Sequence, residues 1–570
     1  MTTGSLSNPE AQNSRRSLLF HLLGIPASYL LTSYFSNFHS GYLRFVILGI
    51  SFQVLCGLGA FVLLKDAFKK ASWRDSWASL VVLIVAGSLA VSSFVIVRQF
   101  PTLFDLRLVS MEASLLPIFL GLTILSTPGT LWLTRLSDKG EHSHFLEKAG
   151  IVRFAQKHRA GIFLALAFFL TYFIFTQTIN FPGYYTRDKY FETDISDWIE
   201  RLASQPTDAI FPVRAVHPAV VLILRLPVEL LSILLNGDKL QAAFVLSALA
   251  GSACVFVAWL IVKQRTGNTT YALISASLLG ASASHLLLSS MLETYIFSAL
   301  ALISFCFLLQ SDRISLKSTV PVGVAIFGIT ITNLAQACIL YFSKLPRIKV
   351  MIQFVSTVAL ITLLLNALQV ELYPFSEPLY DPSKLLVERR YTHEPFGSFR
   401  QFGERVNLIS RAVLLYGIVA PTPYVLLDEP GAIVPNFRTF RVAAGELHVA
   451  GYKGLADITI KIWVAVLGLA MIQFVFDFFR SRERTMFTLG LLLCLVFNFG
   501  LHLFYGDDPL LYSPDWVYAL VLLVSFSFER RASNRWLQIG SIVFLALTIY
   551  INLGLIHQIM SVAWLFHGGN

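Results

Sequence analysis

Long apolar runs dominate the chain and constrain its fold more than any other feature. Many of them reach about 20 residues, the length that an α-helix needs to cross the hydrocarbon core of a bilayer. The runs are continuous and do not alternate with polar residues, which excludes a transmembrane β-barrel. Charged residues make up only 14% of the chain, whereas soluble domains carry about 25%. The sequence therefore predicts an all-α polytopic membrane protein.

The basic loops between the runs predict the direction of each pass. Lys and Arg gather on the cytoplasmic side of membrane proteins, and the loops at 65–74 and 135–159 are basic. We therefore expect about 13 full passes, with the N-terminus cytoplasmic and the C-terminus external. The expected passes are residues 17–35, 43–64, 77–97, 112–134, 160–180, 239–262, 271–289, 292–309, 349–370, 457–479, 485–503, 513–528 and 536–558.

Two further apolar runs do not fit this alternation as full passes. If 214–235 crossed the membrane, the basic residues at 263–265 would fall outside, so we interpret 214–235 as an interfacial helix. Residues 318–343 must return to the side from which they enter, and a polar break at Thr332 and Asn333 interrupts them. We interpret 318–343 as a re-entrant pair of short helices, which is tolerated where protein surrounds it.

Charge, cysteines and motifs exclude several classes of protein. The net charge of +10 lies in short loops between the runs, so nucleic-acid binding is not expected. The five cysteines lie inside apolar runs, which argues against disulfides and a zinc site. The N-terminus has no cleavable signal pattern. No P-loop, G-x-G-x-x-G or H-E-x-x-H motif is present, so nucleotide binding is not expected. A requirement for a divalent metal is left open.

The polar loop at 181–213 follows a pass that runs outward and carries several acids. In the short amphipathic helix expected there, Asp197 and Arg201 stand four residues apart and can pair. Asp194 is then the acid without a local partner, and it is the candidate general base for a sugar hydroxyl. The alternative is a solvated helix cap. Two other acids of this loop compete for the same site: Asp188, which we also expect to bind substrate, and Glu192.

Three more residues are expected near the external face. His217 precedes Pro218 and is held extended, and the neighbouring Arg214 can meet a phosphate. Glu293 lies at the turn between two apolar runs, where a carboxylate is costly unless it is paired or functional. We expect Glu293 to be a second catalytic acid. The alternatives are an interfacial histidine, an arginine anchor and a helix-cap acid.

The long external segment at 372–456 and the last external loop at 502–515 add candidates for substrate binding. Basic and aromatic residues interleave in the segment, a combination that suits a phosphate or pyrophosphate group, although a solvated loop is the alternative. Aromatic residues of the last loop are also typical of the membrane-interface belt. The candidates are Arg389, Arg390, Arg400, His502, Tyr505 and Tyr512.

The order of these features resembles the multi-spanning GT-C glycosyltransferases, which include the protein O-mannosyltransferases and the aminoarabinose transferase of lipid A. In that family the first external loop carries the catalytic acid and an HPP-like motif follows it. The matching residues here are Asp194, His217 and Pro218, with Ala219 in place of the second proline. The family's later external acid corresponds to Glu293.

The resemblance covers about residues 160–560 and implies a GT-C-like helical bundle. It implies a polyprenyl-phosphate-linked sugar as donor, contacted by the loop with Tyr505 and Tyr512, and inversion at the sugar. With such a donor, the departing phosphate would be held by His217, Arg214 and some of Arg389, Arg390 and Arg400. The acceptor would be a lipid, a glycan or a protein, and the active face would be the external side of the inner (plasma) membrane. The expected division of the chain is a four-span module at 1–159, a catalytic core at 160–371, the external segment at 372–456 and a last four-span part at 457–570.

Three rival functions are weighed against this one. A transporter or flippase for a lipid-linked glycan would carry charges inside its spans and an internal repeat, and the sequence has few such charges and no clear repeat. An O-antigen ligase or polymerase shares the many spans and one long external loop. A scaffold without enzymatic activity needs no convergence of Asp194, His217 and Glu293 on one cavity.

Overall fold

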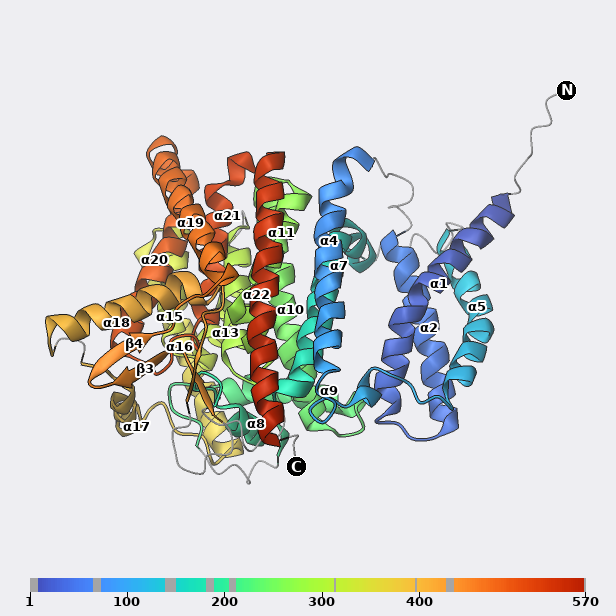
Figure 1. The fold of residues 1–570 in the computed structure, drawn as a ribbon, viewed down its shortest axis with the longest axis horizontal. Helices are drawn as coiled ribbons and strands as arrows, with labels where there is room; N and C mark the ends of the chain where they lie inside the picture. Colours follow the sequence, from blue (N-terminus) through green and yellow to red (C-terminus); the bar gives the residue numbers. More distant parts are fainter. Residues whose placement is uncertain are drawn as a thin grey trace. The chain divides into compact units, whose positions relative to one another are not determined.

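The protein is an all-α polytopic membrane protein (Figure 1). The computed structural model describes residues 9–64, 73–138, 150–180, 189–204, 212–311, 314–394, 397–426 and 435–567. Among them, ten helices are long and apolar enough to cross a membrane. Each coincides with an expected pass. They are α1 (Pro9–Ser36), α2 (Tyr42–Leu64), α4 (Trp73–Val97), α5 (Leu116–Asp138), α7 (Gly150–Ile179), α10 (Lys239–Thr266), α16 (Ile348–Leu372), α19 (Leu455–Arg480), α20 (Arg482–Phe504) and α22 (Arg535–His567).

The other three expected passes are shorter helices. Residues 271–289 divide into α11 (Thr269–Ala281) and α12 (Ala283–Leu288), because the Ser282 hydroxyl accepts the N–H of His285 and starts a new helix. The remaining two are α13 (Tyr295–Leu309) and α21 (Pro514–Ser527). Every residue of α21 is buried. The turn before α13 is also buried, and non-helical backbone at membrane depth is tolerated when protein surrounds it.

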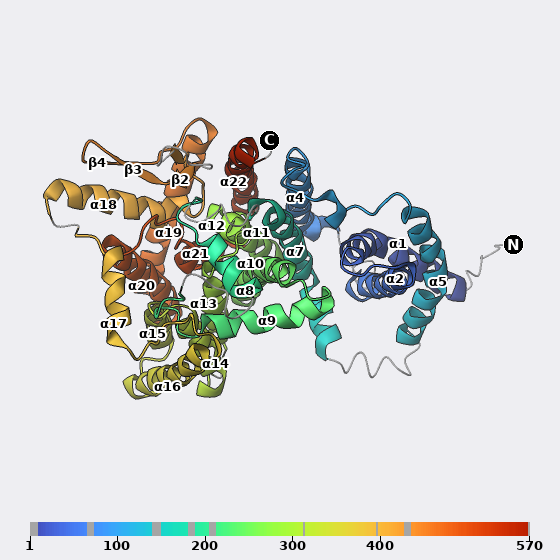
Figure 2. The same cartoon turned by 90° about the horizontal axis from the view of Figure 1, so that it is seen from below.

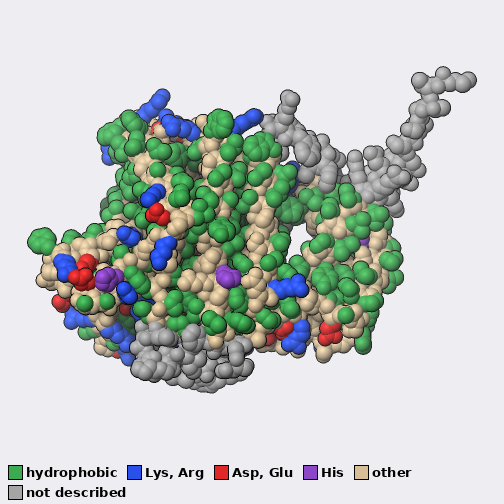
Figure 3. All heavy atoms as spheres, viewed as in Figure 1, with side chains coloured by type: hydrophobic (Ala, Val, Ile, Leu, Met, Phe, Trp, Pro, Cys, Tyr) green, Lys and Arg blue, Asp and Glu red, His purple; other side chains and the backbone are tan. Residues whose placement is uncertain are grey.

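The chain forms two compact units. The N-terminal unit comprises Met1–Trp77, Asp105–Ile162 and Ile233–Asp238, and the main unit comprises Ala78–Phe104, Phe163–Ser232 and Lys239–Asn570. Most of α4 therefore belongs to the main unit, whereas the sequence grouped it with the first four spans. Figure 3 shows hydrophobic side chains over much of the outward surface of the long helices.

In the N-terminal unit, α1, α2 and α5 pack around small and polar residues. Gly24 lies so close to the α2 backbone that a Cβ there would stand 2.7 Å from the Gly57 nitrogen. Gln53 donates to the Thr123 hydroxyl at 2.9 Å and accepts from the Ser126 hydroxyl at 2.5 Å. Such seams of small and polar residues hold helices together in lipid, where no hydrophobic force acts between them.

In the main unit, residues 316–344 form the broken pair of helices that the sequence predicts. They are α14 (Leu316–Ile329) and α15 (Asn333–Lys344), and the break lies at 330–332. The expected interfacial run forms α9 (Val220–Leu234). In Figure 2, α10, α11 and α22 are viewed nearly along their axes, whereas α9 is viewed from the side, so α9 runs across the direction of these three helices. Leu226 and Leu230 of α9 are exposed, as an interfacial helix requires.

Residues 372–456 contain short helices and two small sheets. The helices are α17 (Pro382–Leu386), a 3₁₀ turn at Val387–Tyr391 and the amphipathic α18 (Phe399–Arg411). The strands β1 (Tyr424–Leu426) and β2 (Asn436–Arg438) pair antiparallel, as do β3 (Phe440–Ala443) and β4 (Glu446–Val449). Ala444 and Gly445 connect β3 to β4 with positive φ at both positions, the geometry of a tight hairpin turn.

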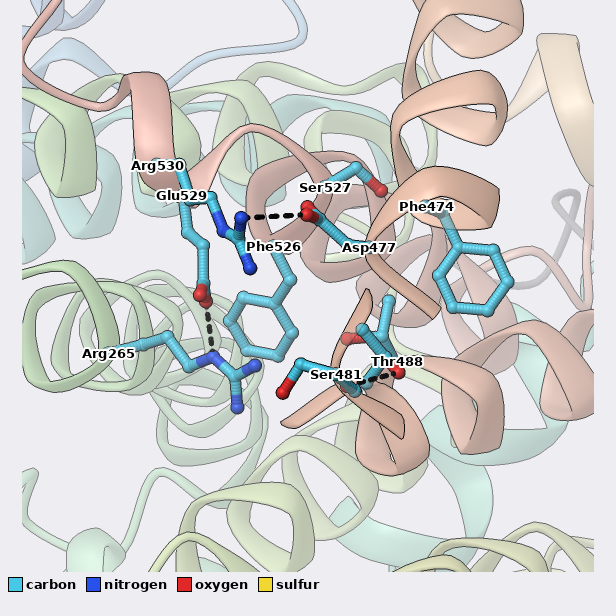
Figure 4. A pocket seen from close by; sticks show the side chains of 10 residues that line it. Arg265, Phe474, Asp477, Ser481, Thr488, Phe526, Ser527, Glu529 and Arg530 are labelled. Carbon is cyan, nitrogen blue, oxygen red and sulfur yellow. Dashed lines mark hydrogen bonds and ion pairs between the residues drawn. The ribbon is translucent and has the colours of Figure 1, made fainter. Parts of the chain in front are cut away.

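One end of the main unit gathers the basic residues 263–265 and the basic turns at 480–484 and 529–535, all of which the positive-inside rule predicts to be cytoplasmic. Arg265 pairs with Glu529 at 2.5 Å, and Arg530 pairs with Asp477 at 3.3 Å, so the ends of α10, α19 and α21 meet there (Figure 4). Ser481, at the start of α20, lies beside this cluster. Since α20 has 23 residues, its other end lies about 35 Å away.

Candidate functional site

At the far end of α20, the main unit contains a polar cavity of about 190 Å³. Asp194, His217 and Glu293, which the sequence singled out separately, all line it. Three of the four external polar segments expected from the sequence contribute to its wall. The other lining residues are Asp197, Trp198, Arg201, Pro212, Arg214, Thr294, Tyr295, Glu377, Val387, Arg390 and Tyr391.

Asp194 is positioned by an unusual turn and by a short helix. It is the N-cap residue of α8 (Ile195–Ala203), but its side chain makes no capping bond to that helix. Phe191 and Glu192 both have positive φ, 56° and 64°, a conformation that costs about 1–3 kcal/mol for each such residue. Pairing with β2 holds this turn, since the Phe191 N–H donates to the Phe437 carbonyl at 2.9 Å.

The structure places the three competing loop acids differently. Glu192 forms an ion pair with Arg438 of β2. Asp188 lies outside the described residues. Asp194 faces the cavity. Among the acids of this loop that the structure describes, Asp194 and Asp197 line the cavity, and Asp197 pairs with Arg201 at 3.4 Å, as the four-residue spacing predicts.

Glu293 lies against Asp194, just before α13. Its Oε1 accepts the backbone N–H of Asp194, and its Oε2 accepts the N–H of Thr294 at 3.2 Å. Burial, and next the negative charge of Asp194, raise the pKa of Glu293 well above the usual carboxyl range. Two carboxyl groups that are joined by a hydrogen bond therefore line one cavity.

Arg214 is held by Glu388 and Tyr391, which the sequence did not single out, and its partner Glu388 also contacts Tyr505, which it did. Arg214 pairs with Glu388 at 3.0 Å, and the same Glu388 oxygen accepts the Tyr505 hydroxyl at 2.6 Å. The Arg214 guanidinium lies 4.7 Å from the centre of the Tyr391 ring, and that of Arg390 lies 4.8 Å from it. Two guanidinium groups therefore gather around one aromatic ring at the cavity wall.

Backbone pairing holds these walls in place. The N–H of Glu377 donates to the Val213 carbonyl, which joins the Arg214 segment to the start of the long external segment. The N–H of His393 donates to the Phe504 carbonyl, which joins the other end of the same stretch to the end of α20. The wall is thus built from segments that lie far apart in the sequence.

His217 is buried, with its ring edge-on to Trp198. Its Nδ1 lies 2.6 Å from the carbonyl oxygen of Ile329, at the end of α14. Burial, and next the positive charge of Arg214, lower the pKa of His217 to about 3. The ring is therefore neutral near pH 7, which differs from the phosphate-binding role that the sequence suggested for it.

The remaining candidates divide between the cavity and other places. Arg390 lines the cavity, whereas the neighbouring Arg389 is exposed and is not part of the wall. Arg400 lies on α18 and pairs with Glu404 and Glu446. His502 and Tyr512 are buried and contact each other with tilted rings, whose centres lie 4.5 Å apart. Tyr512 also meets Tyr295, a wall residue, edge to face at 5.2 Å.

Sequence reasoning missed several wall residues. Trp198, Tyr295 and Tyr391 look like ordinary aromatics of a membrane protein, and only their neighbours Asp197, Thr294 and Arg390 carry a polar signal. The wall residue Glu377 and the Arg214 partner Glu388 lie in the long external segment, where acids are usually solvated. Within the part of the chain that the structure describes, no cluster of three or more His, Cys, Asp or Glu residues is arranged to hold a metal ion.

Comparisons with protein-family models, with curated proteins and with solved structures found no match to this chain.

Proposed function

We propose that the protein is a membrane glycosyltransferase, which moves a sugar from a polyprenyl-phosphate-linked donor to an acceptor hydroxyl at the external face of the membrane. One observation carries this proposal: Asp194 and Glu293 line the same cavity as Arg214 and Arg390. A general base and a site for a departing phosphate are the two parts that such a transfer needs.

The transfer is a single displacement in which Asp194 is the general base. Its carboxylate takes the proton of the acceptor hydroxyl, whose oxygen forms a bond to the anomeric carbon of the donor. The bond between that carbon and the phosphate oxygen breaks, and the electron pair leaves with the polyprenyl phosphate. Arg214 and Arg390 stabilise the charge that develops on the phosphate. Attack from the opposite side inverts the configuration at the sugar.

The two carboxyl groups divide the roles of base and partner. Because burial and the charge of Asp194 raise the pKa of Glu293, Glu293 is the carboxyl group of the pair that holds a proton. The bond from the Asp194 backbone to Glu293 holds the base in position. Glu293 thus acts by placing Asp194 and by carrying the proton of the pair.

The test is sugar transfer by the purified protein from a panel of polyprenyl-phosphate-linked hexoses and pentoses. We expect Asp194→Asn to lower the rate at least about a hundredfold, because it removes a general base while keeping the shape. Asp457→Asn is the matched control: Asp457 is exposed on α19, pairs with Lys461 and is not a wall residue. Equal rates for wild type and Asp194→Asn would rule out this base, and Glu192→Gln would then be measured.

Two adjacent arginines test the phosphate site. Arg389 and Arg390 are both exposed, but only Arg390 lines the cavity. We expect Arg390→Gln to raise the KM for the donor about tenfold or more, since a hydrogen bond to a charged group contributes about 1.5–3 kcal/mol. Arg389→Gln should leave the KM within a factor of two. Equal effects of the two substitutions would mean that general surface charge attracts the donor.

A further inference from the structure

His217 lines the cavity, and its Nδ1 lies against the Ile329 carbonyl. We infer that Nε2 of His217 accepts a hydrogen bond from a hydroxyl group of the sugar that enters the cavity, so that His217 selects the ligand by that hydroxyl. This assignment rests on the proposed function, and it replaces the contact between His217 and a phosphate that the sequence suggested.

The tautomer follows from the partner of Nδ1. A carbonyl oxygen only accepts hydrogen bonds, so the nitrogen that lies 2.6 Å from the Ile329 carbonyl carries the proton. In a neutral ring the other nitrogen, Nε2, is then an acceptor without a proton. His217 lines the cavity, so a group inside the cavity is the partner available to this nitrogen.

The surrounding charges keep the ring uncharged. Arg214 and Arg201, from the segments on either side, both disfavour a positive imidazole, and burial acts in the same direction. The acids that line the same cavity are Asp194, Asp197, Glu293 and Glu377, of which Asp197 is paired with Arg201 and Glu377 with Lys384. A phosphate needs donors, and Nε2 without a proton offers none.

The backbone around His217 cannot shift without breaking several bonds. The N–H of Ile331 donates to the Val216 carbonyl, and the N–H of Ala219 donates to the Gly328 carbonyl at 2.8 Å. Gln369 accepts the N–H of Val221 at 2.9 Å. Hydrogen bonds therefore join the segment of His217 to the break between α14 and α15. They set the direction of Nε2 before a ligand arrives.

A fixed acceptor selects among sugars because it loses its hydrogen bond when the sugar lacks the matching hydroxyl. A sugar with a hydroxyl at the matching position satisfies Nε2, whereas the corresponding deoxy sugar leaves a nearly buried acceptor without a partner. We expect the deoxy donor to be used roughly 10- to 100-fold less well, as the loss of one buried hydrogen bond predicts. The site therefore discriminates by the presence of a hydroxyl and not by charge.

A ligand-free measurement tests the tautomer. In protein labelled with ¹⁵N-histidine, the signals that disappear in His217→Phe belong to His217. We expect a neutral ring with the proton on Nδ1 at every pH from about 5 to 8. A protonated ring at pH 7, or a proton on Nε2, would overturn the assignment even if the protein transfers sugar.

Three substitutions test the contact with the sugar, using the donor that the panel identifies. His217→Gln keeps an acceptor near the position of Nε2. His217→Asn keeps a donor for the Ile329 carbonyl but removes the acceptor, and His217→Lys introduces a positive charge. We expect His217→Asn to raise the KM for the donor 10- to 100-fold. His217→Gln should bring the KM most of the way back to the wild-type value, and His217→Lys should bring none of it back. Rescue by Lys but not by Gln would show that a phosphate contacts this position, and equal effects of all three would show that His217 only shapes the fold.

If no donor of the panel is transferred, the proposed function fails, and the ligand-free spectrum still decides the tautomer.

Discussion

The backbone N–H of Asp194 donates a hydrogen bond to Oε1 of Glu293, and this bond joins the loop before α8 to the turn before α13. The two acids are separated by 99 positions in the sequence. Their contact converts two isolated polar residues into a carboxyl pair inside one cavity. The pair has consequences for stability as well as for the proposed sugar transfer.

Glu293 should make the protein less stable as the pH rises. Its folded pKa is raised by burial and by Asp194, so its contribution is fully present below the unfolded carboxyl pKa of about 4.3. That contribution is lost as the pH rises from there through the folded pKa of Glu293. Thermal unfolding midpoints of the detergent-solubilised protein, measured from about pH 4.5 to 8, should fall more steeply for wild type than for Glu293→Gln. Parallel curves would mean that Glu293 is ionised in the folded protein.

Arg214 and Glu388 should be energetically coupled. Their ion pair is largely buried, with side-chain exposures of 21% and 13%. We expect Arg214→Gln and Glu388→Gln each to destabilise the protein, and the double variant to lose about 0.5–3 kcal/mol less than the sum. Unfolding in mixed micelles by titration with sodium dodecyl sulfate measures the free energy. Additive effects would show that the two side chains act independently.

Gly24→Ala should destabilise the N-terminal unit. A Cβ at Gly24 would stand 2.7 Å from backbone atoms of α2, which cannot move aside. Overpacking of this kind costs about 1–3 kcal/mol. Gly59→Ala, on α2 itself, is the control, because a Cβ there meets nothing within 4 Å. We expect that control to be neutral or stabilising in thermal unfolding, and a lower midpoint for Gly59→Ala than for Gly24→Ala would contradict the packing.

Glu529→Gln should lower stability without changing sugar transfer. Glu529 is 6% exposed and pairs with Arg265 at the end of the bundle remote from the cavity. Removing one partner of a buried pair costs about 3–5 kcal/mol, whereas Asp457→Asn, in an exposed pair, should cost about 1 kcal/mol or less. Unfolding and transfer are measured on the same samples. A loss of transfer at temperatures where the variant remains folded would link the two ends.

Cysteine labelling should distinguish the two faces of the membrane. Phe399 on α18 is 97% exposed, and Trp536 follows the basic turn at 529–535 and is 81% exposed. With the native cysteines replaced by alanine, Phe399→Cys should react with a membrane-impermeant maleimide in sealed right-side-out vesicles. Trp536→Cys should react only after permeabilisation. The reverse pattern would invert the orientation and place the cavity on the cytoplasmic side.

Hydropathy predicts the long helices well because the bilayer fixes their length. Ten expected passes coincide with long apolar helices, and the break in 318–343 lies within two residues of Thr332. Hydropathy does not reveal the helix break at Ser282, whose hydroxyl starts a new helix inside an apolar run. The β3–β4 hairpin also carries a weak signal, because Ala444 adopts the positive φ that Asn usually supplies.

The candidate site was predictable only in part. Asp194, His217 and Glu293 stood out because polar residues are rare at membrane edges, and the structure places all three on one cavity. The proton state of His217 depends on Ile329, whose carbonyl is free because α14 ends there. Arg400 is not part of the cavity wall, and it pairs instead with Glu404 and Glu446. The contacts with Ile329 and Glu446 are tertiary and leave no local trace in the sequence, whereas Arg400 and Glu404 stand four residues apart on one helix.

The wall of the cavity also has a consequence for biogenesis. The Arg214–Glu388 pair is completed by Tyr505, and most of the chain is synthesised between Asp194 and that tyrosine. A nascent chain that extends past Glu293 but not to Glu388 therefore contains both acids of the carboxyl pair but lacks the partner of Arg214. The contact among Arg214, Glu388 and Tyr505 can therefore form only late in translation, after both acids of the carboxyl pair have been synthesised.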